Sequence, residues 1–382
     1  PLPPRVMAAE GRSARRRARL RRAAAATALL ALVRPAVLLH APQGVRPADL
    51  ALAVPGSPRH LVVLQHGLSG TAGDLRLLGE ELSRRSGGRA LVLSAASNQG
   101  QNRDGIAAGG KRLVREIRSV VTKHHGLAEI SLVGNSLGGL YTRFAVSELL
   151  EESGLVGGLR PAAFVTIGCP HLGVRSFTFL PLPPSLQSLA RFFVGQTGEE
   201  LMLRDAEGLV QRMAEPGSRF LAALRSFRRR ALYANLWGDF MVPFGTAAIE
   251  PSWGPGFSDE QNVESFLARP GVEVLSQPVL QRDADGLAAR LQAPAADANR
   301  EAEGEAAAGD GSSAEAAMAT SLEACGWSKF AVAFRGTGTW FPMAHNKIAA
   351  LRREGWRRYA FSWLEGTEDG DELMGHMADY IL

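Results

Sequence analysis

Residues 130–144 have the sequence ISLVGNSLGGLYTRF, in which a short apolar run is followed by a glycine-rich bend and then by helix-like spacing. The run ISLVG at 130–134 is typical of a strand buried on both faces. Leu140 and Phe144 are one helical turn apart and indicate a helix that begins directly after the bend. The stretch therefore predicts a strand, a sharp turn and a helix, with Ser136 on the turn.

The bend Gly134-Asn135-Ser136-Leu137-Gly138 fits the pattern G-x-S-x-G. A serine on such a turn has its hydroxyl exposed above the sheet, and the flanking glycines leave room for the neighbouring strand and helix. One alternative is an ordinary glycine-rich turn. Another is a phosphate-binding loop, which this bend does not resemble because no lysine follows it. The context favours Ser136 as a nucleophile.

Other short apolar runs alternate with helical patterns along the body of the chain. Helical spacing of apolar residues is clearest around 113–121, and strands are expected at 61–65, 90–94, 130–134, 163–168, 231–237 and 330–334. Regular alternation of strands and helices indicates a mostly parallel sheet with helices on both faces. The predicted fold class is therefore α/β, with three layers, and chemistry is expected at the carboxyl ends of the strands.

A serine nucleophile needs a histidine as base, and in this kind of fold the order along the chain is serine, acid, histidine. Three histidines follow Ser136. His171 comes directly after a strand and before any suitable acid, so a structural role or a place in the site wall is expected. His376 lies in a C-terminal amphipathic helix, where packing or surface exposure is expected. His345 follows the 330–334 strand just ahead of a new helix and is the predicted base.

The predicted acid is Asp239, which follows the strand at 231–237 in WGDFMVPFGTA. A turn or capping role is the alternative for this residue. Weaker candidates lie in a helical stretch or in or beside a low-complexity segment: Asp205, Asp283, Asp285, Asp297 and Asp310. The oxyanion donors are expected to be the backbone N–H groups of Leu137 and of Leu68 in QHGLSGTAGDL, where His66 shapes the loop.

Charge and composition are uneven along the chain. The net charge is +5, but residues 1–40 hold nine arginines and one acidic residue, so the remainder is slightly acidic and does not indicate nucleic-acid binding. The Arg/Ala-rich leader, residues 1–45, favours a plastid or mitochondrial address over a secretory signal or an untargeted cytoplasmic tail. Cys169 and Cys325 show no metal-ligand spacing, so no metal site is expected. Free thiols are favoured over one long-range disulfide.

The rest of the chain, residues 55–382, is expected to form one domain with two insertions. Residues 293–320 lack aromatic side chains and are interpreted as a solvated low-complexity insertion. Residues 172–230 are interpreted as a cap above the sheet. Its apolar residues are expected either to bind an acyl chain or to pack against one another, and those assigned to the substrate are Phe177, Phe179, Phe192 and Phe193.

Five ordered segments together resemble a known family. HGLSGTAGDL, LVGNSLGGLYTRFA, FVTIGCPHLGVR, YANLWGDFMVPFGTAAI and AHNKI are similar to the serine esterase family of α/β-hydrolases that was once catalogued as a domain of unknown function. The similarity covers about residues 58–260 and 325–382. It implies an α/β-hydrolase fold and lipase-like activity on acyl lipids, with Ser136, Asp239 and His345 as the catalytic triad.

The predicted function is a serine ester hydrolase that cleaves acyl-lipid esters through an acyl-enzyme intermediate and needs no cofactor. The partner expected is the acyl-lipid substrate, with peripheral contact to a membrane or lipid droplet and no nucleic acid. An acyl-protein or acyl thioesterase uses the same chemistry and is the nearest alternative. A catalytically silent lipid-binding scaffold on this fold is the alternative from another class.

Overall fold

The computed structural model describes residues 57–177, 190–236, 238–239, 241–253, 272–276, 311–334, 344–351 and 370–382. The chain is divided at residue 50, and all of these described residues belong to the unit Ala51–Leu382. The unit before this boundary is Pro1–Leu50. The first unit lies outside the described residues, so the predicted address carried by residues 1–45 stays a prediction. The description below concerns the second unit.

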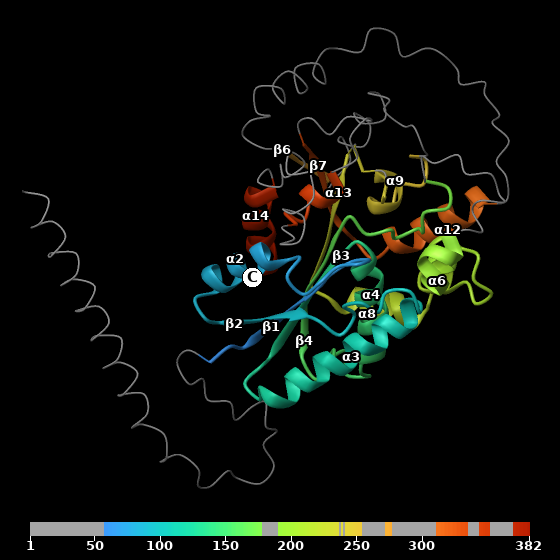
Figure 1. Cartoon of the computed structure of the whole chain (residues 1–382). Helices are drawn as coiled ribbons and strands as arrows, with labels where there is room; N and C mark the ends of the chain where they lie inside the picture. Colours follow the sequence, from blue (N-terminus) through green and yellow to red (C-terminus); the bar gives the residue numbers. More distant parts are fainter. Residues whose placement is uncertain are drawn as a thin grey trace, which may run out of the picture. The chain divides into compact units, whose positions relative to one another are not determined.

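The described strands form one seven-stranded sheet in which all neighbouring strands run parallel (Figure 1). Across the sheet the order is β2 (Ala90–Ala95), β1 (His60–Gln65), β3 (Glu129–Asn135), β4 (Arg160–Ile167), β5 (Arg229–Asn235), β7 (Ser328–Ala333) and β6 (Val272–Ser276). The six predicted strands are all present. The predicted fold class is therefore confirmed, and β6 is a strand that the sequence analysis missed.

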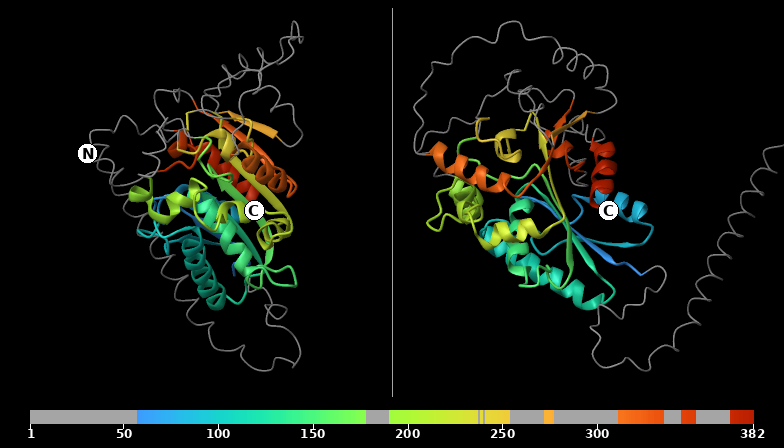
Figure 2. Two further views of the ribbon diagram at one scale, coloured as in Figure 1. Left: turned by 90° about the vertical axis from the view of Figure 1, so that its right-hand side faces the viewer. Right: turned by 180° about the vertical axis from the view of Figure 1, so that it is seen from behind.

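Helices cover both faces of the sheet (Figures 1 and 2). One layer contains α3 (Ile106–Lys123), α4 (Leu137–Leu149) and α8 (Arg219–Ser226), and the other contains α2 (Arg76–Ser86) and α14 (Asp371–Ile381). Side chains alternate between the faces along each strand. In β1, Leu61 and Val63 join the core under α3 and α4, whereas Val62 and Leu64 join the core under α2 and α14. Burial on both faces explains why the strands are continuous apolar runs.

Five further helices lie within the described residues. They are α6 (Ala190–Leu201), α7 (Leu209–Arg212), α9 (Phe244–Ala247), α12 (Gly311–Glu323) and α13 (Ala344–Lys347). The predicted cap at 172–230 contains α6 and α7, but α8 packs against α4 and is part of the helical layer. No helix among the described residues is long and apolar enough to cross a membrane.

Helix α12 corrects one prediction. Residues 293–320 were expected to form a solvated insertion, but from Gly311 onward the chain is helical. Met318, Ala319 and Leu322 are buried in the core, and Glu315 is buried while it accepts hydrogen bonds from Arg175 and Ser176. The expectation failed for 311–320 because alanine has high helix propensity and two larger apolar residues one turn apart are enough to anchor a helix to an existing core. Residues 293–310 lie outside the described residues.

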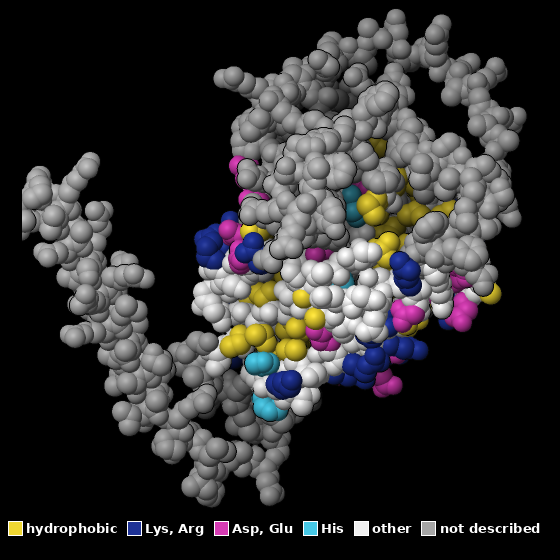
Figure 3. All heavy atoms as spheres, in the orientation of Figure 1, with side chains coloured by type: hydrophobic (Ala, Val, Ile, Leu, Met, Phe, Trp, Pro, Cys, Tyr) yellow, Lys and Arg dark blue, Asp and Glu magenta, His cyan; other side chains and the backbone are white. Residues whose placement is uncertain are grey.

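Charged side chains on the described surface are mixed in sign. On the face shown in Figure 3, Lys and Arg side chains lie beside Asp and Glu side chains. Several of these residues form exposed pairs, such as Arg76 with Glu80 and Arg84 with Glu81. Such pairs contribute little to stability but are typical of a solvated surface.

Helices α3 and α4 approach closely because α3 has glycines where the two helices meet. A Cβ atom at Gly109 would lie 2.3 Å from Cε1 of Tyr141, and one at Gly110 would lie 2.4 Å from Cδ1 of Phe144. Both aromatic side chains are buried. The contact holds α4, whose first residue follows Ser136, firmly against the rest of the layer.

We expect Gly109→Ala to lower the free energy of unfolding by about 1–3 kcal/mol, because the added methyl group overlaps the Tyr141 ring. Gly79→Ala in α2 is the matched control. Its Cβ would be 3.5 Å from the nearest atom, so the variant should be neutral or stabilised by up to about 1 kcal/mol. Urea unfolding of both variants measures the difference, and equal effects would contradict the close α3–α4 contact.

Helix α6 is joined to the start of α3 by buried polar groups. Glu200, 1% exposed, accepts a hydrogen bond from the backbone N–H of Ile106 over 2.6 Å. The pKa of Glu200 is raised to about 7, chiefly by burial, and the charges of Asp205 and Glu207 act in the same direction, whereas the Ile106 N–H and the Gln196 amide favour the carboxylate. A carboxyl group whose pKa is higher in the folded than in the unfolded chain stabilises the fold at low pH. That contribution is lost as the pH rises through the folded-state pKa.

We therefore expect Glu200→Gln to gain stability relative to the wild type as the pH is raised from 5 to 8. Glutamine can still accept the Ile106 hydrogen bond but does not ionise. Thermal unfolding at several pH values measures the change, with Glu152→Gln at an exposed position as the control. A difference in Tm between wild type and Glu200→Gln that stays constant from pH 5 to 8 would contradict the prediction.

Candidate active site

Ser136 occupies a strained turn between β3 and α4. Its backbone has φ 54° and ψ −128°, a combination that residues other than glycine rarely adopt. A Cβ at Gly138 would lie 2.4 Å from the carbonyl oxygen of Gln65, and one at Gly134 would lie 2.4 Å from Cα of Gly139. The N–H of Ser136 donates to the carbonyl of Ile167 over 2.7 Å. The glycines of the motif are therefore required by packing, as the sequence predicted.

The loop after β1 lies directly against Ser136. A Cβ at Gly67 would be 2.7 Å from Cβ and 3.3 Å from Oγ of Ser136. The loop closes through a hydrogen bond of 3.1 Å from the N–H of Gly70 to the carbonyl of Gly67. Within the described part of the chain, neither the N–H of Leu68 nor that of Leu137 donates a hydrogen bond. These are the two donors that the sequence assigned to the oxyanion hole.

Asp239 and His345 form a buried hydrogen-bonded pair. The Nδ1–H of His345 donates to Oδ2 of Asp239 over 2.8 Å, and both residues are at most 5% exposed. The same Oδ2 accepts from Nδ2 of Asn235 over 2.9 Å, while Oδ1 accepts from the N–H groups of Met241 and Val242. A carboxylate held in this way keeps the proton on Nδ1 of the histidine and leaves Nε2 to accept another.

The backbone after β4 connects the pair with Ser136. Gly168 follows Ile167, whose carbonyl holds the N–H of Ser136. A Cβ at Gly168 would lie 3.4 Å from Nδ1 and Cε1 of His345 and 3.9 Å from Oδ2 of Asp239. Among the described residues no hydrogen bond joins Ser136 and His345 directly. Such bonds are often long in hydrolases without substrate and shorten when substrate binds.

The other candidate histidines have structural surroundings. His171 is completely buried, its Nε2 lies 2.9 Å from the hydroxyl of Thr166, and its ring packs edge-on against Trp327. Burial lowers the pKa of His171 well below the ordinary value, and the positive charges of Arg143 and Lys329 lower it further. His376 packs in α14, where its Nδ1 lies 2.9 Å from the Tyr233 hydroxyl.

A buried arginine connects α4 with two other segments. Arg143 donates to the carbonyls of His171 and Met213 and is fully buried. Burial lowers its pKa to about 10, so the guanidinium stays charged near neutral pH. Burial also raises the pKa of the neighbouring Cys169 to about 12, which keeps that thiol protonated and unreactive. Cys169 and Cys325 are both free thiols.

The side chains of the four phenylalanines predicted to contact the substrate lie in the interior or outside the described residues. Phe177 is 1% exposed and packs against Gly245 of α9, so it belongs to the interior. Phe179 and the side chains of Phe192 and Phe193 lie outside the described residues. In the described ranges no cluster of three or more His, Cys, Asp or Glu side chains is arranged to bind a metal ion.

A comparison with protein families gives the context for this site. The model of the family described as "Putative serine esterase (DUF676)" matches residues 55–250, which is half of the chain. The chain belongs to this serine esterase family. The matched range includes Leu68, Ser136 and Asp239 and ends before His345.

Curated relatives of this family member include two yeast proteins. One is "Putative lipase C4A8.10" of Schizosaccharomyces pombe, 31% identical over 211 residues, which covers 50% of this chain and 26% of that protein. The other is "Putative lipase ROG1" of Saccharomyces cerevisiae, 31% identical over 207 residues, which covers 52% of this chain and 30% of that protein. The matched part thus spans less than a third of these two relatives.

Solved structures similar to this serine esterase family member include two bacterial hydrolases. The mature Bacillus licheniformis lipase BlEst2 is 16% identical and aligns over 52% of this chain and 72% of its own, with a TM-score of 0.32. The esterase Est2 of Thermogutta terrifontis is 15% identical and aligns over 55% and 69%, with a TM-score of 0.33.

Two residues of the site in this serine esterase family member were missed by the sequence analysis. Asn235 ends β5 and donates to Asp239. Gly168 has no side chain, and its backbone lies next to the imidazole of His345. A signal was present for Asn235, since it is a polar residue in the otherwise apolar run ALYANLW. Gly168 in IGCPHLG looks like an ordinary turn glycine, because its neighbours in space are far away in sequence.

Proposed function

We propose that this serine esterase family member hydrolyses carboxylic esters by a two-step acyl-enzyme mechanism with Ser136, His345 and Asp239 as its triad. The observation that carries the proposal is the buried His345–Asp239 hydrogen bond beside the backbone that holds the strained Ser136. This combination supplies an activated hydroxyl and a base whose tautomer is defined.

The chemistry follows from the donors and acceptors of these three residues. The hydroxyl oxygen of Ser136 attacks the ester carbonyl while Nε2 of His345 takes its proton. The resulting imidazolium, stabilised by Asp239, gives that proton to the departing alcohol, and the acyl group remains on Ser136. Water then attacks the acyl-enzyme in the same way and releases the carboxylic acid.

The backbone around Ser136 supports stabilisation of the tetrahedral intermediate. Leu137 directly follows the nucleophile and Leu68 follows Gly67, which lies against Ser136, and neither N–H donates a hydrogen bond within the described residues. Leu137 is also the first residue of the 13-residue helix α4, so the positive end of the helix dipole points to the same place. Donors fixed in advance stabilise the oxyanion because they need no reorganisation during the reaction.

We propose acyl lipids as the substrate class, bound under the 172–230 cap at a lipid surface. Two observations support this. The two yeast relatives carry the name lipase. In addition, the stretch TFLPLPPSLQSLARFFV at 178–194 is rich in large apolar residues, as expected for a segment that contacts acyl chains.

We expect a fluorophosphonate probe to label the wild type and not Ser136→Ala, since the probe reacts with an activated serine. His345→Ala and Asp239→Ala should be labelled far more slowly. Circular dichroism shows whether each variant is folded, and Ser131→Ala, at the far end of β3, is the control for loss of a buried hydroxyl. Labelling of folded Ser136→Ala at the wild-type rate would contradict the assignment.

Hydrolysis of a matched panel tests the substrate class. We expect monoacylglycerols with long acyl chains to be cleaved with higher kcat/KM than short nitrophenyl esters. A higher kcat/KM for acyl thioesters would favour a thioesterase. Equal values for all chain lengths would contradict an acyl-binding site.

We expect Gly67→Val to lower kcat by about a hundredfold or more, because any side chain here collides with Ser136 and displaces the Leu68 N–H. Gly73→Val in the same loop is the control. Its Cβ would meet only the Thr71 hydroxyl oxygen, at 3.7 Å, so kcat should stay near the wild-type value. If Gly67→Val folds and hydrolyses nitrophenyl esters normally, the loop does not contribute to catalysis.

A further inference from the structure

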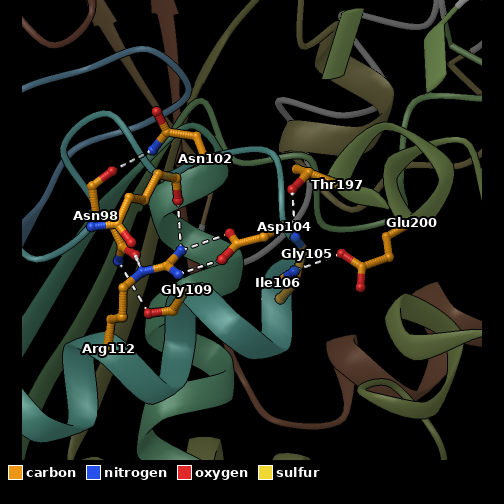
Figure 4. A network of polar contacts seen from close by, with 10 residues as sticks. Asn98, Asn102, Asp104, Gly105, Ile106, Gly109, Arg112, Thr197 and Glu200 are labelled. Atoms are coloured by element: carbon orange, nitrogen blue, oxygen red, sulfur yellow. Dashed lines mark hydrogen bonds and ion pairs between the residues drawn. The ribbon is translucent and has the colours of Figure 1, made fainter. Parts of the chain in front are cut away.

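Residues 96–105, between β2 and α3, form a polar network that the triad does not include (Figure 4). Its central residues are Asn98, which is fully buried, and Asn102, which is 5% exposed. Burial of a side-chain amide is costly unless its donors and acceptors are all used. The contacts of these two asparagines therefore indicate what the network holds in place.

Asn102 holds the loop that carries Leu68. Its Oδ1 accepts a hydrogen bond of 3.0 Å from the N–H of Ser69, and its Nδ2 donates to the carbonyl of Asn98 over 2.9 Å. Ser69 has φ 53°, in the left-handed region that residues other than glycine disfavour. The bond from Asn102 thus offsets the cost of the conformation that closes the loop.

The closed loop determines where the N–H of Leu68 points. The carbonyl of Gly67 accepts from the N–H of Gly70 over 3.1 Å. In a trans peptide the N–H of the next residue points opposite to that carbonyl. With Gly67 against Ser136, the peptide between Gly67 and Leu68 is held in one orientation as long as Ser69 keeps its conformation.

The network is anchored on α3 and β1. Nδ2 of Asn98 donates to Oε1 of Gln65 and to the carbonyl of Gly109, both over 3.1 Å, and its Oδ1 accepts from Nε of Arg112 over 2.8 Å. Arg112 makes a two-pronged ion pair with Asp104 at 2.5 and 2.8 Å. Asn102 therefore lies in a segment that is held at Asn98 on one side and at Asp104 on the other.

Helix α6 closes the same segment from the other side, as Figure 4 shows. The N–H of Gly105 donates to the hydroxyl of Thr197 over 3.0 Å, and the N–H of Ile106 donates to Glu200. Thr197 is fully buried. The network thus lies between α6 of the cap and the loop after β1.

We propose that Asn102 is a positioning residue for the oxyanion hole, which acts by holding Ser69 and thereby aiming the N–H of Leu68 at the developing oxyanion. The inference rests on the proposed ester hydrolase function. It assigns the buried network a specific task, which is to keep one catalytic donor oriented in the absence of substrate.

The test compares Asn102→Ala with Asn102→Asp. Asn102→Ala removes the acceptor for the Ser69 N–H and should lower kcat for a nitrophenyl ester about 10- to 100-fold, with KM changed by less than about threefold. Asn102→Asp keeps an acceptor oxygen toward Ser69 and should restore most of the lost kcat. Ser131→Ala is the control, because it removes a buried hydroxyl bonded to His60 and the N–H of Ala163 at the opposite end of β3. It should lower stability and leave kcat unchanged.

A trifluoromethyl ketone gives a readout that a purely structural role does not affect. This inhibitor adds to the serine hydroxyl and places a negative oxygen in the oxyanion hole. Its affinity for Asn102→Ala should fall by the same factor as kcat/KM. An Asn102→Ala protein with normal kcat, or with reduced kcat and unchanged inhibitor affinity, would overturn the proposal.

The failure of the proposed function gives a different result. In that case the wild type itself does not hydrolyse esters or react with a fluorophosphonate. If the wild type is active and Asn102→Ala is too unstable to assay, Asn102→Leu replaces it, because leucine also removes the acceptor for the Ser69 N–H but fills the space of the amide. A joint loss of kcat and inhibitor affinity supports the positioning role, and a normal kcat, or a loss of kcat without a loss of inhibitor affinity, contradicts it.

Discussion

The structure depends on one steric constraint, the close contact of three backbone segments around Ser136. The end of β1, the turn after β3 and the first residues of α4 approach so closely that a single methylene at Gly67, Gly134 or Gly138 would lie within 2.7 Å of a neighbour. Such packing allows the serine only one backbone conformation, and that conformation is intrinsically unfavourable. Its cost is offset by the sheet register and by the two hydrophobic cores on either side. The hydroxyl is therefore held by the whole sheet rather than by its own turn.

Around Ser136, buried polar side chains orient one another through hydrogen bonds. Asp239 orients His345, Asn235 and two backbone N–H groups orient Asp239, and Asn102 orients the loop that lies against Ser136. Each of the four side chains is buried, so its energy is favourable only when its partners are present. A site built in this way is rigid before substrate arrives, which is the condition under which fixed dipoles stabilise a transition state most effectively.

The sequence predicts most of the fold because both faces of the parallel sheet are covered. Six strands were recognisable as apolar runs, and the nucleophile turn was recognisable from its glycines. Asp239 and His345 are predicted from the sequence because they follow strands in the expected order, and the structure brings them into hydrogen-bond contact.

Helix α12 was missed because its apolar contrast is weak, with Met318 and Leu322 as its larger buried side chains. Asn102 and Asn235 were missed because a polar residue next to a turn is explained equally well by local turn chemistry. The role of Asn102 becomes visible only when its distant partner Ser69 is known, and that of Asn235 only when Asp239 is known to pair with His345.

Arg143 has a further consequence for the chemistry of this domain. Within the described residues its guanidinium hydrogen-bonds to backbone carbonyls, and no carboxylate forms an ion pair with it, so its positive charge is not cancelled locally. It lies seven residues after Ser136 in α4, about 10 Å along the helix axis. In a medium of low polarity an uncompensated cation at that range adds to the helix dipole and produces a permanent electric field along α4. The electrostatic potential at the N-terminal end of α4 therefore favours a negative charge even when the site is empty.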